Sequence, residues 1–321
     1  MTLFDAYFFV DWSANSEPTR IEPKKDTIWL GELVRGSPPT ERYHRTRTAC
    51  VDDLSARLRA LAVEGLRVLV GFDFAYGYPR GLADALGLPL GPAPWARTWH
   101  LLASRIKDDA KNKNNRWHVA SDLNKTLMPA SHPVGPFWNC PANAATATLR
   151  SSMQAGNLAF PFQTRAGGSL EEWRHAEKRA RKTNSSVQST WKLFTSGSVG
   201  SQALVGIPRV AKLRYDAVLA PFSKVWPFET GFVSAPSPTT GPFVLHAEIW
   251  PVLFNGEVAT QFAADPKLRI LDQAQVRALC VWAECTDAAG QLGQFFDRPN
   301  NLGDPEVKAC VEEEGWILGL R

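Results

Sequence analysis

Alternating apolar and polar stretches in the first part of the chain predict a mixed β-sheet. Residues 6–14 form an apolar run, a polar loop extends from Glu17 to Asp26, and residues 27–34 form a second apolar run. After a break at Pro38-Pro39, residues 42–48 alternate as an exposed edge strand does. Short apolar runs bounded by turn residues are typical of strands. The pattern predicts three strands joined as an antiparallel meander.

A helix and a fourth strand follow this meander. Leu54, Leu58 and Leu61 recur at helical spacing behind an acidic first turn, and residues 67–73 form a short β-branched run. The fourth strand has to return parallel to the first through a right-handed helical crossover. The order β-β-β-α-β therefore predicts an α/β fold with a mixed sheet and flanking helices.

The middle of the chain has a different character, from residue 92 to about residue 208. Tryptophans, Asn-rich turns and Lys/Arg runs replace the regular strands, and Ser169 to Lys182 has the pattern of a helix with Ser169 as its N-cap. We interpret residues 92–208 as a helical and irregular insertion within one domain that spans residues 1–321. The segment 96–192 has fifteen basic and six acidic residues. Such a balance attracts phosphate-bearing partners, although a solvated helical surface is an equally simple explanation.

Regular elements return after the insertion. Residues 225–230 have the pattern of a short strand and residues 243–249 that of a stronger one. Asp272 to Phe296 is amphipathic at helical spacing, and a final helix is predicted from Pro305 to Glu314. These elements complete a sheet flanked by helices.

Composition excludes several classes of protein. No apolar run is long enough for a transmembrane helix, and the N-terminus lacks the basic start of a signal peptide. The five cysteines are scattered without a CxxC pair, which predicts reduced thiols in a cytoplasmic protein and indicates neither a zinc site nor a disulfide framework. The sequence has no G-x-S-x-G nucleophile motif and no G-x-G-x-x-G after the first strand.

Three apolar strands each carry an acid at or near the C-terminal end, namely Asp11, Asp73 and Glu248. A buried charge is costly unless it is paired, hydrogen-bonded or bound to a metal. The first and fourth strands are expected to be neighbours, so Asp11 and Asp73 are expected at one edge of the sheet, where open α/β sheets bind ligands. Converging carboxylates predict a Mg²⁺ or Mn²⁺ site, unless each acid caps a loop or pairs with an arginine.

A fourth acid is expected from the long C-terminal helix. We assign this role to Asp287, with Glu284 and Asp272 as alternatives on the same predicted helix. Carboxylates from strands and one helix can hold one or two divalent ions, which is the arrangement used in phosphodiester cleavage.

Small polar residues provide candidate phosphate contacts. Ser13 and Asn15 follow Asp11 directly, although the same residues are typical of an ordinary turn. The Thr195–Gln202 segment includes Ser198, Gly200 and Ser201, and successive N–H groups in such a loop can form an anion-binding nest or a plain turn.

Basic residues of the insertion provide candidate contacts to a nucleic-acid backbone. Arg174, Lys178, Arg181 and Lys182 have the spacing to share one face of the predicted helix. Together with nearby tryptophans they favour backbone tracking and base stacking. No zinc-finger, RRM or helix-turn-helix pattern indicates sequence-specific readout.

The order of elements and several motifs resemble a known family. The order is similar to the ribonuclease H-like fold, and the motifs resemble the DUF429 group of predicted ribonuclease H-like nucleases. The matching segments are Phe9–Ala14, Gly71–Pro79, Gln188–Lys192, Gly206–Pro208 and His246–Pro251. The resemblance implies acids on strands one and four and on the last helix, and it implies nuclease activity. The chain departs from the group in its Asp-Trp-Ser-Ala turn and its basic insertion.

The sequence leads to three functional hypotheses. The first is a metal-dependent phosphodiesterase or nuclease that uses Asp11, Asp73, Glu248 and Asp287, with nucleic acid or another phosphate-bearing ligand as its partner. The second is a non-nuclease that binds a nucleotide or a phosphorylated metabolite on the same fold. The third is a binding module without chemistry, in which the acids are structural.

Overall fold

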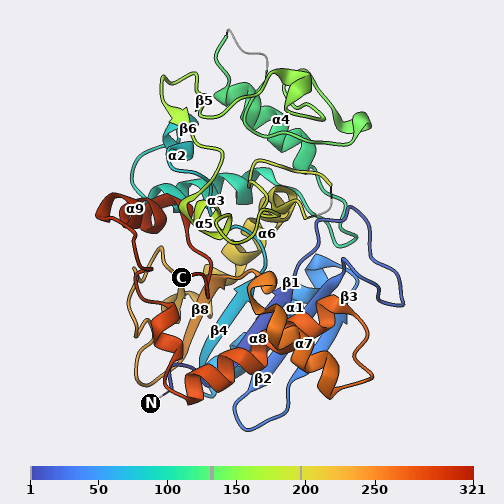
Figure 1. The fold of residues 1–321 in the computed structure, drawn as a ribbon, viewed down its shortest axis with the longest axis vertical. Coiled ribbons are helices and arrows are strands. Elements are labelled where there is room, and N and C mark those ends of the chain that lie inside the picture. Colours follow the sequence, from blue (N-terminus) through green and yellow to red (C-terminus); the bar gives the residue numbers. More distant parts are fainter. Residues whose placement is uncertain (1, 131–133, 196) are drawn as a thin grey trace.

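The computed structural model describes residues 2–130, 134–195 and 197–321. Within these residues a six-stranded sheet has the order β3-β2-β1-β4-β8-β7 (Figure 1). Its strands are β1 (Ala6–Asp11), β2 (Ile28–Val34), β3 (Thr40–His44), β4 (Arg67–Phe72), β7 (Ser223–Val225) and β8 (Phe243–Glu248). β1, β2 and β3 form the predicted antiparallel meander, and β4 returns parallel to β1 after helix α1 (Arg47–Val63). The predicted ribonuclease H-like α/β fold class is confirmed.

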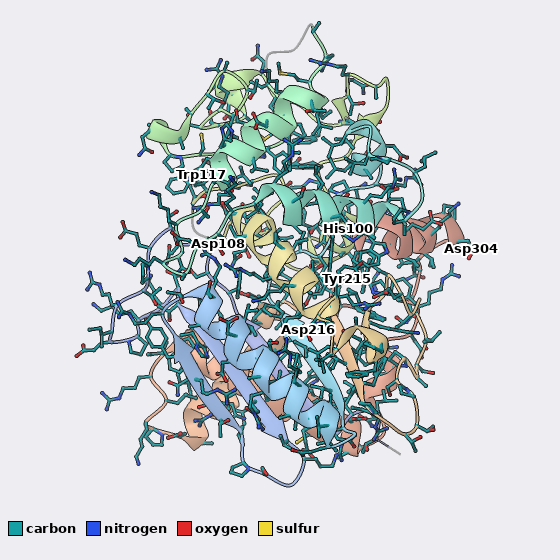
Figure 2. All side chains as sticks on the ribbon, turned by 180° about the vertical axis from the view of Figure 1, so that it is seen from behind. His100, Asp108, Trp117, Tyr215, Asp216 and Asp304 are labelled. Atoms are coloured by element: carbon teal, nitrogen blue, oxygen red, sulfur yellow. The ribbon has the colours of Figure 1, made fainter. Side chains whose placement is uncertain are left out.

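The two faces of the sheet are covered by different helices. Phe8 and Val10 of β1 pack in the apolar cluster that contains the buried leucines of α1, whereas Tyr7 and Phe9 pack in the cluster that contains α8 (Leu271–Ala288). Figure 1 shows α8 and α7 (Asn255–Ala264) on one face, and Figure 2 shows α1 on the other. Alternate residues of one strand point to opposite faces, so this central strand is apolar from Ala6 to Val10.

The predicted insertion lies beyond the C-terminal edge of β1 and β4 (Figure 1). Its elements are α3 (Pro94–Arg105), α4 (Arg116–Leu127), β5 (Phe162–Gln163), β6 (Ser169–Leu170), α5 (His175–Ala180) and the start of α6 (Val199–Arg214), which continues beyond residue 208. The short helix α2 (Leu82–Ala85) precedes the insertion. Ser169 is not the predicted N-cap, because it pairs with Gln163 in a short hairpin. The helix begins later, with Arg174 as its N-cap, and the backbone N–H of Arg174 donates to the Glu177 carboxylate.

Two C-terminal boundaries differ from the prediction. β7 ends at Val225, where the chain turns through backbone hydrogen bonds from Glu229 to Val225 and from Gly231 to Pro227. α8 ends at Ala288, because Gly290 adopts a positive φ of 71° that a helix does not continue through. The last helix, α9 (Asp304–Ala309), continues as a π-helical turn from Cys310 to Glu314. None of the helices described here is long and apolar enough to cross a bilayer.

A buried ionic cluster joins the insertion to the sheet. Asp108, labelled in Figure 2, accepts hydrogen bonds from Arg47 at the start of α1 and from Arg209 of α6. The guanidinium of Arg47 also donates to the carbonyls of Ser13 and Asn15, at 2.8 Å each. The loop that follows β1 is therefore held by the same arginine that anchors the insertion.

Candidate metal centre

Asp11 and Asp73 lie at adjacent ends of parallel strands. β1 and β4 are in register from Ala6 opposite Val68 to Val10 opposite Phe72, so both acids come directly after the last pair. The Asp73 carboxylate accepts the backbone N–H of Trp12 at 2.7 Å, which ties it to the residue after Asp11. The side chain of Asp11 is largely buried, and Asp73 is partly exposed. The right-handed crossover through α1 produces this juxtaposition.

Both carboxyl groups have raised pKa values. Removal from water is the largest cause for Asp11, followed by the negative charges of Asp73, Asp272 and Asp26, and together they raise its pKa well above the usual range. Burial raises the pKa of Asp73 to about 8, the Trp12 N–H opposes this rise, and Asp272 adds to it. Acids that repel one another in a desolvated site gain stability from a proton or a cation.

Asp272 is the acid that α8 brings to this edge. It lies in the first turn of the helix, it is buried, and its carboxylate accepts the backbone N–H of Thr27 at 2.8 Å. Asp26, which the sequence analysis did not single out, precedes Thr27 in an exposed loop. The antiparallel pairing of Asp11 with Trp29 brings the start of β2 beside the end of β1, and this pairing is the signal that identifies Asp26.

Asp287 is separated from the other acids. Its carboxylate accepts the backbone N–H groups of Leu3 and Phe4 at 2.8 Å each, and the Tyr7 hydroxyl at 2.6 Å. These contacts place Asp287 at the N-terminal end of β1, whereas Asp11 is at the C-terminal end. A rise of 1.5 Å per residue separates it from Asp272 by about 22 Å along α8. The acid of α8 that lies near Asp11 and Asp73 is therefore Asp272. Asp287 instead accepts hydrogen bonds from the backbone just before β1.

Glu248 lies at the expected edge but already has a cationic partner. β8 pairs with β4 so that Glu248 is opposite Phe72. Arg174 donates to both Glu248 carboxylate oxygens at 2.6 and 2.7 Å, and Tyr76 donates its backbone N–H at 2.9 Å. Arg174 also pairs with Glu177. The carboxylate of Glu248 is therefore ion-paired within the protein, and it fixes the loop that follows β4.

The donor set formed by Asp11 and Asp73 is suited to a hard divalent cation. Both offer carboxylate oxygens, and Mg²⁺ is typically held by one or two carboxylates while it keeps several waters. Within the part of the chain that the structure describes, these two acids and Asp272 form no trio whose donor atoms all lie within 4.8 Å of one another. The described residues therefore form no closed cage of three carboxylates at this edge.

The predicted phosphate contacts near Asp11 and at the start of α6 are used within the protein. Ser13 accepts the backbone N–H of Asn15 at 3.3 Å, which is a serine turn. Gly200 donates its N–H to the Lys192 carbonyl at 3.1 Å, and Ser201 donates its hydroxyl to the Leu193 carbonyl at 2.5 Å. The Ser198 hydroxyl donates to the carbonyl of Phe194, and Ser196 lies outside the described residues.

The four basic residues of the predicted helix do not form one shared binding face. Arg174 is buried in its pairs with glutamates, and Lys178 pairs with Glu171 at 3.1 Å. The guanidinium carbon of Arg181 lies 4.1 Å from the centre of the Trp173 ring, and Lys182 is exposed. The helix α5 is only six residues long, so the periodicity that suggested one face applies to a single turn and a half.

A cavity of about 350 Å³ adjoins Asp73. It lies between the ends of β4 and β8 and the insertion, and its charged lining residues are Asp73, Glu177, Glu248 and Arg174. Three acids facing one arginine make this lining negative, which favours a cation over a free anion. The remaining wall comes from Phe74 and Ala75, from Ile249, Trp250, Val252 and Ile317, and from Ser186, Val187, Gln188, Gly197 and Val199 of the insertion.

Comparisons with family models, with curated proteins and with solved structures found no match. The positions of the acids, the cavity and the basic insertion are therefore the basis for inferring a function.

Proposed function

We propose that the protein is a metal-dependent phosphodiesterase that acts on nucleic acid. The observation that carries the proposal is the pair Asp11 and Asp73 at neighbouring ends of parallel strands, with raised carboxyl pKa values and no arginine bonded to either in the described structure. Such a pair suits Mg²⁺ or Mn²⁺, because the positive charge of the ion offsets the two carboxylate charges that no arginine of the described structure balances. The resemblance to DUF429-type predicted nucleases agrees with this proposal. The scattered cysteines separately predict a cytoplasmic location.

The protein residues have separable roles in this proposal. Asp11 and Asp73 hold the divalent cation, and Asp272 strengthens the negative field from the start of α8. A bound cation in such a site activates a water and stabilises the leaving oxygen of a phosphodiester. Glu248, held by Arg174, positions the loop after β4 through its hydrogen bond to the Tyr76 N–H.

Basic groups of the insertion lie beside the acidic edge. Lys107, Lys111 and Lys113 are exposed on the loop that contains Asp108 and Asn112. Asn112 donates to the carbonyl of Glu17, so this loop contacts the segment that follows Asp11. Exposed lysines at this place can contact the phosphates of a strand whose scissile group reaches the acids. This arrangement favours nucleic acid over a small uncharged substrate.

Thermal unfolding with and without metal tests the proposed site. Mg²⁺ or Mn²⁺ at a hundredfold excess over Kd stabilises the folded protein by about 2.7 kcal/mol, which corresponds to a rise of a few °C in Tm. Asp11→Asn or Asp73→Asn is expected to abolish this rise, and Asp272→Asn to reduce it. Glu284→Gln, on the same helix as Asp272, is the matched control and should respond as the wild type does.

Cleavage assays complete the test. Fluorescently labelled single strands, duplexes and RNA–DNA hybrids are incubated with Mn²⁺, and the Asp73→Asn variant is the negative control. Metal-induced stabilisation without cleavage of any of these polymers would favour the alternative hypothesis below. An unchanged Tm in the wild type at millimolar metal would contradict the metal site itself.

The cavity next to Asp73 supports a second candidate function, the binding of a nucleotide or a phosphorylated metabolite. Its volume of about 350 Å³ is near the lower end of the range of small-ligand pockets. A mononucleotide bound as a metal complex would raise the Tm beyond the metal alone, with little dependence on salt. A polymer bound through several phosphates weakens steeply between low and physiological salt.

A further inference from the structure

A second group of potential metal ligands lies apart from the aspartates. One donor atom each from His175, Cys310 and Glu314 lie within 4.8 Å of one another. This is the only trio of histidine, cysteine, aspartate or glutamate residues with that property in the described ranges. The residues are separated by up to 139 positions in the sequence, so no short sequence motif indicates that they meet.

The local backbone explains how the three side chains meet. His175 is the first residue of α5, and Cys310 and Glu314 are the two ends of the π-helical turn that follows α9. One Glu314 oxygen accepts the backbone N–H of His175 at 2.7 Å and lies 2.7 Å from its Nδ1, while the other accepts the N–H of Arg80 at 3.0 Å. Single π-helical turns occur preferentially at functional sites.

Two of the three side chains are buried and the third is partly exposed, which is the pattern expected of a metal site with one position open to solvent. Cys310 and Glu314 are almost completely buried, whereas the His175 side chain is 24% exposed. No hydrogen bond from the Cys310 thiol occurs among the described residues. A thiol, an imidazole and a carboxylate around one point are ligands for Zn²⁺ or Co²⁺ rather than for Mg²⁺. With three protein ligands, the fourth tetrahedral position is left for solvent on the His175 side.

We propose that His175, Cys310 and Glu314 bind one Zn²⁺ ion. Binding replaces the hydrogen bond between His175 and Glu314. The Nδ1 proton of His175 moves to Nε2 or, from the imidazolium, leaves to solvent, and the thiol proton of Cys310 leaves to solvent as well. Thiolate and carboxylate together then balance the charge of the ion. Bonds of 2.0–2.1 Å at tetrahedral angles place nitrogen and oxygen ligands about 3.3 Å apart. The His175 ring therefore has to move away from Glu314 by about 0.6 Å, which a partly exposed side chain permits.

A Zn²⁺ ion at this site would stabilise the wall of the Asp73 cavity that contains Arg174 and Glu248. Arg174, next to His175, donates to the Glu314 carbonyl at 2.7 Å and holds Glu248. Glu248 in turn accepts the N–H of Leu318 at its carbonyl. An ion at this place joins α5 to the C-terminal segment and keeps Arg174 on Glu248. The proposal does not depend on the phosphodiesterase activity.

Cobalt is the probe that tests this site, because a Co²⁺–thiolate bond has a charge-transfer absorption in the near ultraviolet. The full-length, metal-free protein is titrated with Co²⁺ under reducing conditions. We expect one equivalent to produce this band together with intense visible bands of tetrahedral Co²⁺, and Zn²⁺ to displace both. Cys310→Ser should remove the charge-transfer band, and His175→Gln should weaken Co²⁺ binding by more than about tenfold.

Two controls separate this site from other metal binding. Cys285→Ser removes an exposed thiol elsewhere in the chain and should leave the spectrum unchanged. Asp73→Asn should also leave it unchanged, so that failure of the aspartate site and failure of this site are distinguishable.

The proposal is overturned if the wild type gives no thiolate band, or if Cys285→Ser removes the band and thus reveals adventitious binding. Should Cys310→Ser fail to fold, His175→Gln decides the matter, because unchanged Co²⁺ affinity in that variant also overturns the proposal.

Discussion

At the scale of single residues, some buried charges of the protein are paired with opposite charges, and others lie near charges of the same sign. Arg174 is buried between Glu177 and Glu248, so each of these groups finds an opposite charge. Asp11 and Asp73 instead face other acids and have raised carboxyl pKa values. Removal of one partner from the first arrangement would leave a buried charge unpaired, whereas the second arrangement has a cost in stability that a proton offsets.

The raised pKa of Asp73 predicts that the metal-free protein loses stability as the pH rises. The unfolded carboxyl ionises near pH 4, whereas the folded one keeps its proton to about pH 8. The folded state therefore binds more protons between these values, and its free energy of unfolding falls with increasing pH. Urea denaturation in the presence of a chelator should show Asp73→Asn to be more stable than wild type at pH 9, on the order of 3 kcal/mol. An advantage equally large at pH 4 would contradict this explanation.

The buried arginine predicts a large effect of its removal. Arg174→Met leaves Glu177 and Glu248 buried without a partner and should reduce the free energy of unfolding by about 3–5 kcal/mol. Adding Glu248→Gln to this variant should restore part of the loss, because one unpaired charge is then removed. Lys178→Met on the same helix breaks only an exposed pair and should change stability by less than about 1 kcal/mol. Urea denaturation of the four proteins is the measurement.

At the scale of elements, the start of α6 forms part of the cavity wall because small residues let it approach the segment 190–193. A Cβ atom on Gly200 would lie 2.5 Å from the carbonyl oxygens of both Thr190 and Lys192. These are backbone atoms, which cannot move aside as a flexible side chain can. The small residues that resembled a phosphate loop in the sequence therefore have a packing reason.

Gly200→Ala is expected to displace the start of α6 and to destabilise the protein by about 1–3 kcal/mol. The matched control is Gly256→Ala in α7, where a Cβ atom meets nothing within 4 Å. That change should be neutral or stabilising by about 0.5–1 kcal/mol, because alanine restricts the unfolded chain more than glycine does. Thermal unfolding compares the two variants, and equal effects would contradict the close approach at Gly200.

At the scale of the whole molecule, the insertion covers the edge of the sheet that carries Asp11 and Asp73, and it has an excess of basic residues. Asp108 connects α1 and α6, and Arg47 connects the same cluster to the loop after Asp11 (Figure 2). The acidic edge and the basic loop are therefore connected through one ionic cluster. This separation of charge suits a polyanion that is held by lysines and cut at acids.

The basic loop predicts a measurable change in salt dependence. Each phosphate contact with a single strand contributes about −0.7 to the slope of log K against log salt. Replacing Lys107, Lys111 and Lys113 together by glutamine should make the slope for a labelled single strand less steep by about 2. Fluorescence anisotropy at several salt concentrations measures this. Lys308→Gln on α9, which is exposed and distant in sequence from the loop, is the control, and an effect there of equal size would contradict the assignment.

The order of the first strands, and the location of Asp11 and Asp73 at one edge of the sheet, could be predicted from the sequence. Strand alternation and the handedness of the crossover are local rules, so they placed Asp11 and Asp73 at one edge without coordinates. The folded chain was needed to choose Asp272 over Asp287 on α8, to pair Arg174 with Glu248, and to bring His175 to Cys310 and Glu314. Side-chain pairing depends on the direction and packing of elements that are far apart in the chain. The periodicity of apolar residues describes each element alone, so it does not predict these contacts.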